Sequence, residues 1–376
     1  MANLLRAIAT RIGLWPSWLK IVSIGVVALL VVAAVAVPVT LRLRARPAAT
    51  AHRSPANASP AGTFLSPGAD SLVADLTCRL PISSNAPGSG GFVGFPTAEF
   101  TSDPGSNTSD ATRYEYGGLT YDRAVHRWLS VRRSAITPDG TRFVYWSGRD
   151  SDFHLVSASS GAETPIGPRL NGPGWYAASA ARFNWASGGP PWGLLEAAAD
   201  GAYAVPPATQ TPFAAGLWFF PYAGTSERQI ASGGYWQNVG GGAAWGTGAP
   251  SVPQGATVTI LRLDLGTGVT TAWFSQDGEF AQVAGFDADG HPVVVTSTED
   301  AFQVWLVDGQ MHGTELLNLP KEPPKPGYGE EPPIRSVIGD VNGVWMAASD
   351  GLYLYRRGRT QKVSTVTGQI GGGCGA

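Results

Sequence analysis

The chain has 376 residues, enough for one large or two ordinary domains, and 43% of them are hydrophobic, which allows a sizeable core. Only 14% are charged and the formal net charge is -2, which argues against a nucleic-acid partner because such partners need a basic field to meet the phosphates. The 49 Gly and 29 Pro residues indicate many turns and few long helices.

The first element in chain order is an apolar run over residues 21–41, which contains no charged residue. As a helix this run would be about 31 Å long, the thickness of a bilayer core. A cleaved signal peptide is the alternative, with Ala34 and Ala36 as small residues at the cleavage site. The length of the run and Pro38 favour a retained anchor. The sequence therefore predicts a cytoplasmic segment 1–20 and a transmembrane helix 21–41, which would hold the protein at the membrane.

Residues 42–74 are rich in Ala, Pro and Ser and contain almost nothing that a core would bury. This composition is typical of a flexible tether. The chain is therefore expected to have a linker over 42–74 and a folded domain over 75–376. Basic residues flank the apolar run on both sides, so the flanking charges do not decide which way the domain faces.

A repeat runs through the predicted domain. Glycines that close a turn after an aromatic or aliphatic run occur at Gly161, Gly224, Gly268, Gly313 and Gly358, and the last three steps are 44, 45 and 45 residues. A further hairpin begins at Gly118, which makes six. Units of about 45 residues with roughly four short strands are typical of propeller blades. We therefore predict an all-β fold, a six-bladed β-propeller over 75–376, and regard a pair of β-sandwiches as the weaker alternative.

An earlier Asp-Gly turn accompanies four of these hairpins, since Asp-Gly supplies the positive φ angles of a tight turn. The pairs begin at Asp139, Asp200, Asp289 and Asp350. The first three lie 22 to 24 residues before the hairpin glycine and the fourth lies 8 before it, so the fourth is expected to serve a different turn.

The stretch ITPDGTRFVYW, Ile136 to Trp146, followed by DFHLVSASSGAETPI, resembles one blade of a TolB-like β-propeller. The resemblance covers residues 134–168, and the later units keep Asp-Gly but lose the proline. It implies a six-bladed fold with a binding or scaffolding role. It implies no catalytic residue, because the shared motif is structural.

The two cysteines, Cys78 and Cys374, stand near the two ends of the predicted propeller. A closed ring brings its ends together, so we expect a disulfide, which would stabilise the fold by roughly 5 kcal/mol in the chain-entropy model. Two idle thiols of an intracellular protein are the alternative. The predicted bridge requires an oxidising compartment, which places the domain on the extracytoplasmic side of a single-pass membrane protein.

Signals for catalysis or metal binding are weak. The chain has no Gly-x-Ser-x-Gly motif, and its five histidines show no metal-ligand spacing. The stretch from Asp287 to Gly290 half resembles a calcium loop, but it lacks the first and last carboxylates and is interpreted as a turn. We therefore predict no catalytic residue, no cofactor and no metal.

Aromatic residues gather between 175 and 245, where flat rings beside glycines would suit a sugar. The candidate ligand face consists of Trp175, Trp185, Trp192, Tyr235, Trp236 and Trp245. Packing between blades is the alternative and the favoured interpretation. The predicted function is a non-catalytic binding or scaffolding module for a protein or an envelope polymer. The alternative is a propeller-type hydrolase or lyase that acts on polysaccharide, with paired carboxylates from distant blades.

Overall fold

The computed structural model describes residues 71–83, 90–107, 118–147, 150, 152–167, 193–205, 216–224, 227–248, 256–321 and 333–375. These residues form seven antiparallel sheets, which we name A to G in chain order. Two short 3₁₀ helices, η1 (Pro104–Ser106) and η3 (Arg133–Ala135), lie between strands. The described chain is therefore all-β.

Sheets A to C contain β1 to β8 and the last strand, β25. Sheet A has the order β25-β1-β2-β3, sheet B pairs β4 with β5, and sheet C has the order β6-β7-β8. The strands are β25 (Gln369–Ile370), β1 (Arg79–Ser83), β2 (Gly91–Gly94), β3 (Glu99–Ser102), β4 (Thr120–Asp122), β5 (Arg127–Leu129), β6 (Arg142–Ser147), β7 (Asp152–Ser157) and β8 (Glu163–Gly167).

Sheets D to G each have four strands that follow one another in sequence. Sheet D holds β9 (Gly193–Ala197), β10 (Gly201–Val205), β11 (Leu217–Pro221) and β12 (Arg228–Ala231). Sheet E holds β13 (Tyr235–Gly240), β14 (Ala243–Thr247), β15 (Thr257–Asp264) and β16 (Thr270–Asp277). Sheet F holds β17 (Phe280–Phe286), β18 (Pro292–Ser297), β19 (Ala301–Gly309) and β20 (His312–Pro320). Sheet G holds β21 (Ile334–Asp340), β22 (Gly343–Ala348), β23 (Gly351–Arg356) and β24 (Arg359–Ser364).

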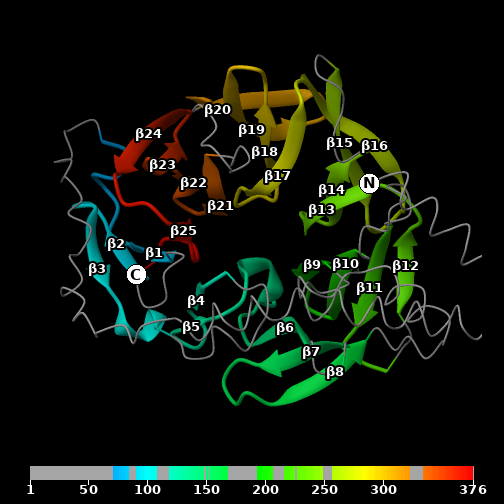
Figure 1. The fold of residues 1–376 in the computed structure, drawn as a ribbon. Coiled ribbons are helices and arrows are strands. Elements are labelled where there is room, and N and C mark those ends of the chain that lie inside the picture. Colours follow the sequence, from blue (N-terminus) through cyan, green and yellow to red (C-terminus); the bar gives the residue numbers. More distant parts are fainter. Residues whose placement is uncertain are drawn as a thin grey trace, which may run out of the picture. The chain divides into compact units, whose positions relative to one another are not determined.

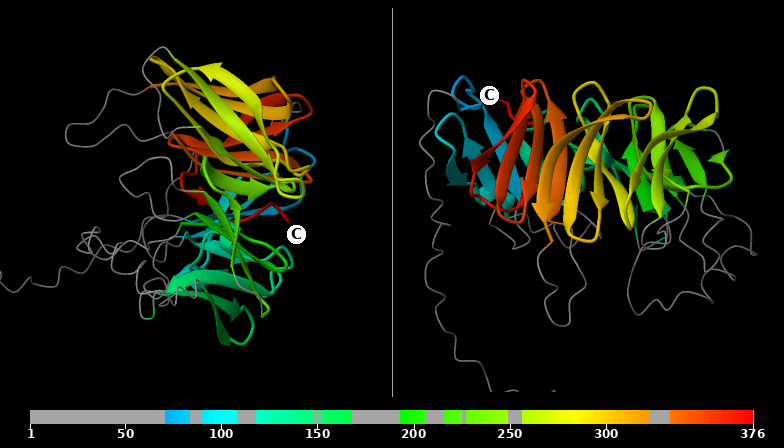
Figure 2. Two further views of the ribbon diagram at one scale, coloured as in Figure 1. Left: turned by 90° about the vertical axis from the view of Figure 1, so that its right-hand side faces the viewer. Right: turned by 90° about the horizontal axis from the view of Figure 1, so that it is seen from above.

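The sheets stand around a common axis within the unit that spans Pro60–Ala376 (Figure 1). Strands β25, β4, β9, β13, β17 and β21 lie on the inside of the ring, and β3, β12, β16, β20 and β24 lie on its outside. Figure 2 shows the same sheets edge-on, with their strands running between the two faces of the ring.

Burial follows this radial order. The second strands β14 and β18 are buried along their whole length, whereas the outer strands β3 and β12 have no buried residue. A second strand has a neighbouring sheet on each of its faces, so both faces need apolar side chains. This explains the runs AAWGT and PVVVTS, which show no alternation of polar and apolar residues.

Neighbouring sheets pack through apolar side chains at every interface of the described ring. Hydrophobic clusters join B to C, C to D, D to E, E to F, F to G and G to A. Between A and B, the ring of Phe92 contacts Tyr121 edge-on at 4.8 Å and Trp128 at 5.7 Å between centroids. Each sheet therefore packs on two others, which is a propeller-type arrangement.

The predicted repeat corresponds to one specific turn of each sheet. Gly161, Gly224, Gly268 and Gly358 lie in the hairpins that lead to the last strand of sheets C, D, E and G. Gly313 is the second residue of β20, just after the equivalent hairpin of sheet F. The hairpin from Gly118 forms β4 and β5 of sheet B. The six expected units are thus sheets B to G, and the count of six omits sheet A. This sheet escaped detection because it combines the two ends of the folded chain and lacks the glycine-closed hairpin.

The Asp-Gly turns also occupy the positions that their spacing predicted. Asp200-Gly201 and Asp289-Gly290 connect the first two strands of their sheets, and Asp139-Gly140 precedes β6 in the same way. Asp350-Gly351 instead connects the second and third strands of sheet G. The expectation of a different turn in the last unit is confirmed.

The folded part of the chain begins earlier than residue 75. Leu72 and Val73, assigned to the linker from composition, are buried in the cluster between sheets A and G. Arg356 of β23 donates to the backbone oxygen of Leu72 at 3.2 Å. The predicted transmembrane segment 21–41 lies outside the described residues, and among those that are described no helix is long and apolar enough to cross a membrane.

Candidate functional site

The aromatic residues of the predicted ligand face have separate surroundings. Trp236 and Trp245 are 5% and 3% exposed and belong to different clusters, one between sheets D and E and the other between E and F. Their indole N–H groups donate to backbone oxygens at 2.7 and 3.1 Å. Tyr235, at the start of inner strand β13, is 36% exposed. Of the six residues, Tyr235 is therefore the one described ring that presents a large surface to solvent. The other three, Trp175, Trp185 and Trp192, lie outside the described residues.

A turn between β17 and β18 brings three metal-type ligands together. One ligand atom each from Asp287, Asp289 and His291 lies within 4.8 Å of the others. The Asp287 carboxylate already accepts the backbone N–H groups of Asp289 and His291 and contacts the His291 ring at 2.9 Å. These bonds are those of an aspartate-capped turn. They account for the cluster as a turn, in agreement with the interpretation drawn from sequence.

The two ends of the folded chain are joined covalently. Cys78, just before β1, forms a disulfide with Cys374, and the two Cα atoms are 5.4 Å apart. The predicted bridge is confirmed. The glycine-rich tail around Cys374 also pairs with sheet A, since β25 bonds to β1 and Arg79 exchanges backbone hydrogen bonds with Gly375.

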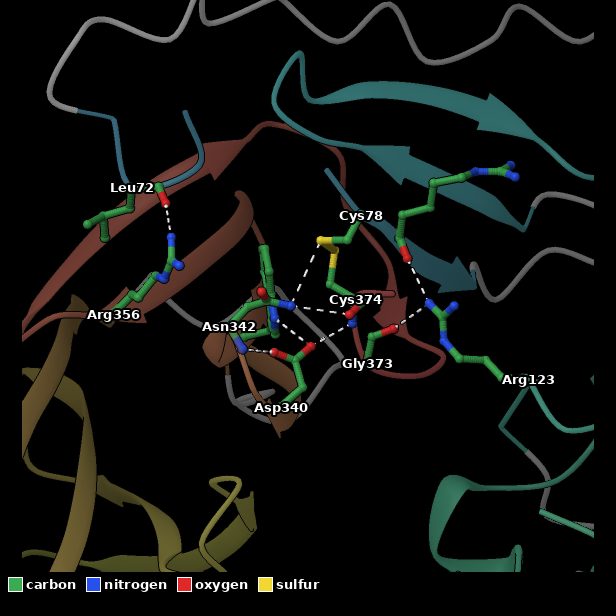
Figure 3. The surroundings of a disulfide bond; sticks show 10 residues. Leu72, Cys78, Arg123, Asp340, Asn342, Arg356, Gly373 and Cys374 are labelled. Carbon is green, nitrogen blue, oxygen red and sulfur yellow. Dashed lines mark hydrogen bonds between the residues drawn. A yellow bond between two sulfur atoms is a disulfide. The ribbon is translucent and has the colours of Figure 1, made fainter. Parts of the chain in front are cut away.

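Side chains from two other sheets hold this tail (Figure 3). The Asp340 carboxylate, at the end of β21, accepts the backbone N–H of Cys374 at 2.6 Å, and the Asn342 amide donates to the Cys374 carbonyl at 3.2 Å. Arg123, after β4, donates to the carbonyls of Gly373 and Arg79 at 2.9 and 3.0 Å. We call Asp340, Asn342, Arg123 and the disulfide the clasp. It ties sheet A to both of its neighbours.

Each inner strand of sheets D to G contains one β-bulge. The pairing with the second strand skips Leu195 in β9, Gln237 in β13, Ala284 in β17 and Arg335 in β21. A bulge leaves one residue unpaired and redirects its side chain, and bulges are frequent beside binding sites. Bulges also occur on the outer strands β8, β12, β16, β20 and β24, so they do not by themselves distinguish the inside of the ring.

Contacts between inner strands show which residues share a level along the axis. The Gln237 amide of β13 donates to Ala281 at 3.3 Å and accepts from the N–H of Val283 at 2.9 Å. These two residues flank Gln282 of β17. Gln237 and Gln282 therefore lie at one level.

The next step goes from β17 to β21. A Cβ placed on Gly285 would lie 2.5 Å from the carbonyl oxygen of Val337, so these two residues are side by side. Inner strands run in the same direction, so the residues that precede them also correspond. Gln282 is therefore level with the start of β21, where Arg335 lies.

The tail strand continues the same level. The backbone N–H of Ile370 donates to Ser336 Oγ at 2.7 Å, which places Gln369 beside Arg335. A Cβ on Gly118 would be 3.7 Å from Gln369 Oε1 and 3.8 Å from the Cα of Arg132. Gln369 and Arg132 are therefore neighbours across Gly118.

Two further contacts, from η3 to β9 and from β9 to β13, connect the remaining inner elements at this level. Arg133 acts electrostatically on Glu196 of β9, and η3 contacts this strand. Strand β9 also contacts β13, and Leu195 and Trp236, which precede Glu196 and Gln237, belong to one cluster between these sheets. The level that began at Gln237 thus returns to it.

We name the side chains of this level the polar belt. Arg132, Arg133, Gln282 and Arg335 are exposed, and Glu196 and Gln369 are partly buried. The belt consists of Arg132, Arg133, Glu196, Gln282, Arg335 and Gln369. None of them was selected from sequence, because each is an ordinary polar residue in its own segment and only the registers between sheets bring them together.

Glu196 has the most perturbed carboxyl group of the belt. Burial raises its pKa to about 8, and the positive charge of Arg133 opposes this shift. A carboxyl group with this pKa is largely protonated at neutral pH, so it can donate a proton. Such shifts are frequent at functional sites.

No family model and no curated protein matches the chain. Several solved structures are similar at low sequence identity, among them the following three. A protein assigned as a gluconolactonase has 12% identity and a TM-score of 0.36, covering 67% of this chain and 77% of its own. A quinoprotein alcohol dehydrogenase-like protein from Bacteroides thetaiotaomicron has 11% identity and a TM-score of 0.37, and the match covers 74% of this chain and 61% of that protein. A puromycin-hydrolysing peptidase from Mycobacterium tuberculosis has 14% identity and a TM-score of 0.37, and the match covers 80% of this chain and 48% of that protein. These scores carry no argument about function, and the likeness to TolB-like propellers remains a resemblance.

Proposed function

We propose that this protein is a binding module whose ligand is held at the inside of the ring, and that it does not transform that ligand. The polar belt carries this proposal, because six polar side chains from η3 with its N-cap residue and from four different strands share one level there. Small-molecule and polymer sites commonly combine converging polar groups with a rigid frame. The closed ring and the clasp supply such a frame.

We further propose that the ring lies outside the cytoplasm, tethered by residues 21–41. The disulfide supports an oxidising compartment, and the uncharged run of the sequence supports an anchor. A reporter that is active only outside the cytoplasm, fused after Ala376, is expected to work. Activity of a cytoplasm-specific reporter at the same fusion point would contradict both parts of this placement.

The binding function is tested with the full-length chain in a neutral detergent. Immobilised envelope glycans and envelope proteins are screened for retention, and the same glycans are then analysed for cleavage. Retention without new chain ends is the expected result. Cleavage of a retained glycan would overturn the non-catalytic function.

A second candidate is a hydrolase or lyase acting on polysaccharide, because the raised pKa of Glu196 suits a general acid. Glycoside hydrolysis normally needs a second carboxylate within about 10 Å. Glu196 is the one acidic residue among the described belt residues. Turnover of a retained polysaccharide that is abolished by Glu196→Gln would favour the enzyme, and retention without turnover by the wild-type protein would favour the binding module.

A further inference from the structure

We propose that the polar belt binds an acidic sugar, in which arginines of the belt hold a carboxylate or phosphate group and its amides hold neighbouring hydroxyls. This inference rests on the proposed binding function and specifies its ligand.

The three arginines are available to a ligand. Arg132, Arg133 and Arg335 are exposed, and within the described residues their guanidinium groups make no hydrogen bond or ion pair. Other arginines are engaged, such as Arg123 in the clasp and Arg356 with Asp75. A guanidinium group matches carboxylate and phosphate because it can donate two parallel hydrogen bonds. Exposed arginines at one level therefore favour an anionic ligand, although Arg133 also interacts electrostatically with Glu196.

The belt is cationic at neutral pH although the whole chain carries a formal charge of -2. Glu196 is the belt's only carboxyl group, and burial raises its pKa to about 8, so most of it is uncharged at pH 7. The Asp340 carboxylate is taken up by the N–H of Cys374 and the indole N–H of Trp345. The described belt residues therefore carry a net positive charge, which favours an anionic ligand.

The amides and one aromatic ring favour a sugar over a simple anion. Gln282 and Gln369 each offer a donor and an acceptor, which is the combination that a hydroxyl group needs. Tyr235 lies on β13, two residues before the level of Gln237, and its exposed ring can carry the apolar face of a sugar. An acidic peptide would bind to the arginines, but it would not need the two glutamine amides together with the exposed Tyr235 ring.

The test measures binding by the full-length chain in neutral detergent. The probes are an oligogalacturonate for the carboxylate, mannose 6-phosphate for the phosphate, a neutral xylo-oligosaccharide and polyglutamate. Variants are Arg133→Gln, Arg335→Gln and Arg335→Lys, with Arg228→Gln as the matched control, since Arg228 is an exposed arginine on the outer strand β12. Thermal unfolding and an intact disulfide confirm that each variant folds.

We expect at least one acidic sugar to bind and the neutral sugar to bind at least tenfold more weakly. Each Gln substitution in the belt should weaken binding about tenfold, the size expected for one charge-assisted hydrogen bond. Arg335→Lys should retain part of the affinity, Arg228→Gln should retain all of it, and added salt should weaken binding. The acidic probe that binds more tightly shows whether the arginines hold a carboxylate or a phosphate.

Three outcomes would overturn the inference. Equal binding of the neutral sugar would remove the role of charge, and binding of polyglutamate alone would remove the sugar. Failure of both acidic sugars to bind would remove the ligand class, yet the wider screen could still show retention and so uphold the binding function. Cleavage of a bound acidic sugar would instead remove the non-catalytic function and leave the ligand assignment intact.

Discussion

Replacing Cys374 by Ser removes the covalent closure of the ring and leaves the hydrogen bonds of the clasp in place. The disulfide closes a loop of 296 residues. In the chain-entropy model, a loop of this length contributes roughly 5 kcal/mol by restricting the unfolded chain. For a domain of this size, such a loss lowers the unfolding temperature by about 10 °C. Cys78→Ser should have the same effect, because both substitutions remove one bond.

Thermal and urea unfolding of the wild-type protein, the two single variants and the double variant measures this effect. The double variant should be no less stable than either single variant, since the shared bond can be lost only once. Reductant should lower the stability of the wild-type protein to that of the variants and should leave the variants unchanged. Additive losses in the double variant, or a wild-type protein that is insensitive to reductant although its bridge is reduced, would refute the reasoning.

Three other predictions concern single residues. Because the folded-state pKa of Glu196 is raised to about 8, the native protein keeps a proton that the unfolded chain releases above its ordinary pKa of 4.5. The free energy of unfolding should therefore fall between pH 5 and pH 8, by roughly 2 to 4 kcal/mol. Urea unfolding of Glu196→Gln should lack this fall. An equal fall in the variant would contradict the raised pKa of Glu196. Gly285→Ala should lower the free energy of unfolding by about 1 to 3 kcal/mol, because the new Cβ would meet the Val337 carbonyl at 2.5 Å. Gly248→Ala is the control, since a Cβ there has no neighbour within 4 Å, and equal effects in the two variants would refute the close approach of β17 and β21. Asp340→Asn should lower the free energy of unfolding by about 2 kcal/mol, because both carboxylate oxygens accept N–H groups and an amide NH2 would face one of these donors in either orientation. Hydrogen exchange at the tail should accelerate, and Asp308→Asn, in an exposed hairpin, should show neither effect.

The repeat was predictable because one physical requirement recurs in each unit. A hairpin that leads to an outer strand needs a residue with positive φ, and Gly161, Gly224, Gly268 and Gly358 adopt φ values between 58° and 75°. Together with Gly313, these glycines are visible in sequence, and from Gly224 onward they recur at steps of 44, 45 and 45 residues. Sheet A offered no such signal, because its turn after β2 uses Ala98 at φ 57° and its fourth strand comes from the other end of the chain.

The disulfide was predictable from topology alone, since closing a ring brings Cys78 and Cys374 together whatever the number of sheets. The belt was not predictable in this way. Placing Glu196 beside Arg133, or Gln282 beside Arg335, requires the register between separate sheets. That register depends on close approaches such as Gly285 against Val337 and on the position of each bulge. No local pattern in the chain encodes these contacts.

The closure of the ring and the belt share one short segment. Gln369 enters the belt four residues before Gly373, whose carbonyl Arg123 holds, and five before Cys374. Between them, the carbonyl of Gly371 accepts the backbone N–H of Tyr121 in sheet B. The tail is thus fixed to sheets A, B and G within a few residues. The same bonds that close the ring also fix the Gln369 amide between Arg132 and Arg335, so the clasp is part of the frame that positions the proposed ligand site.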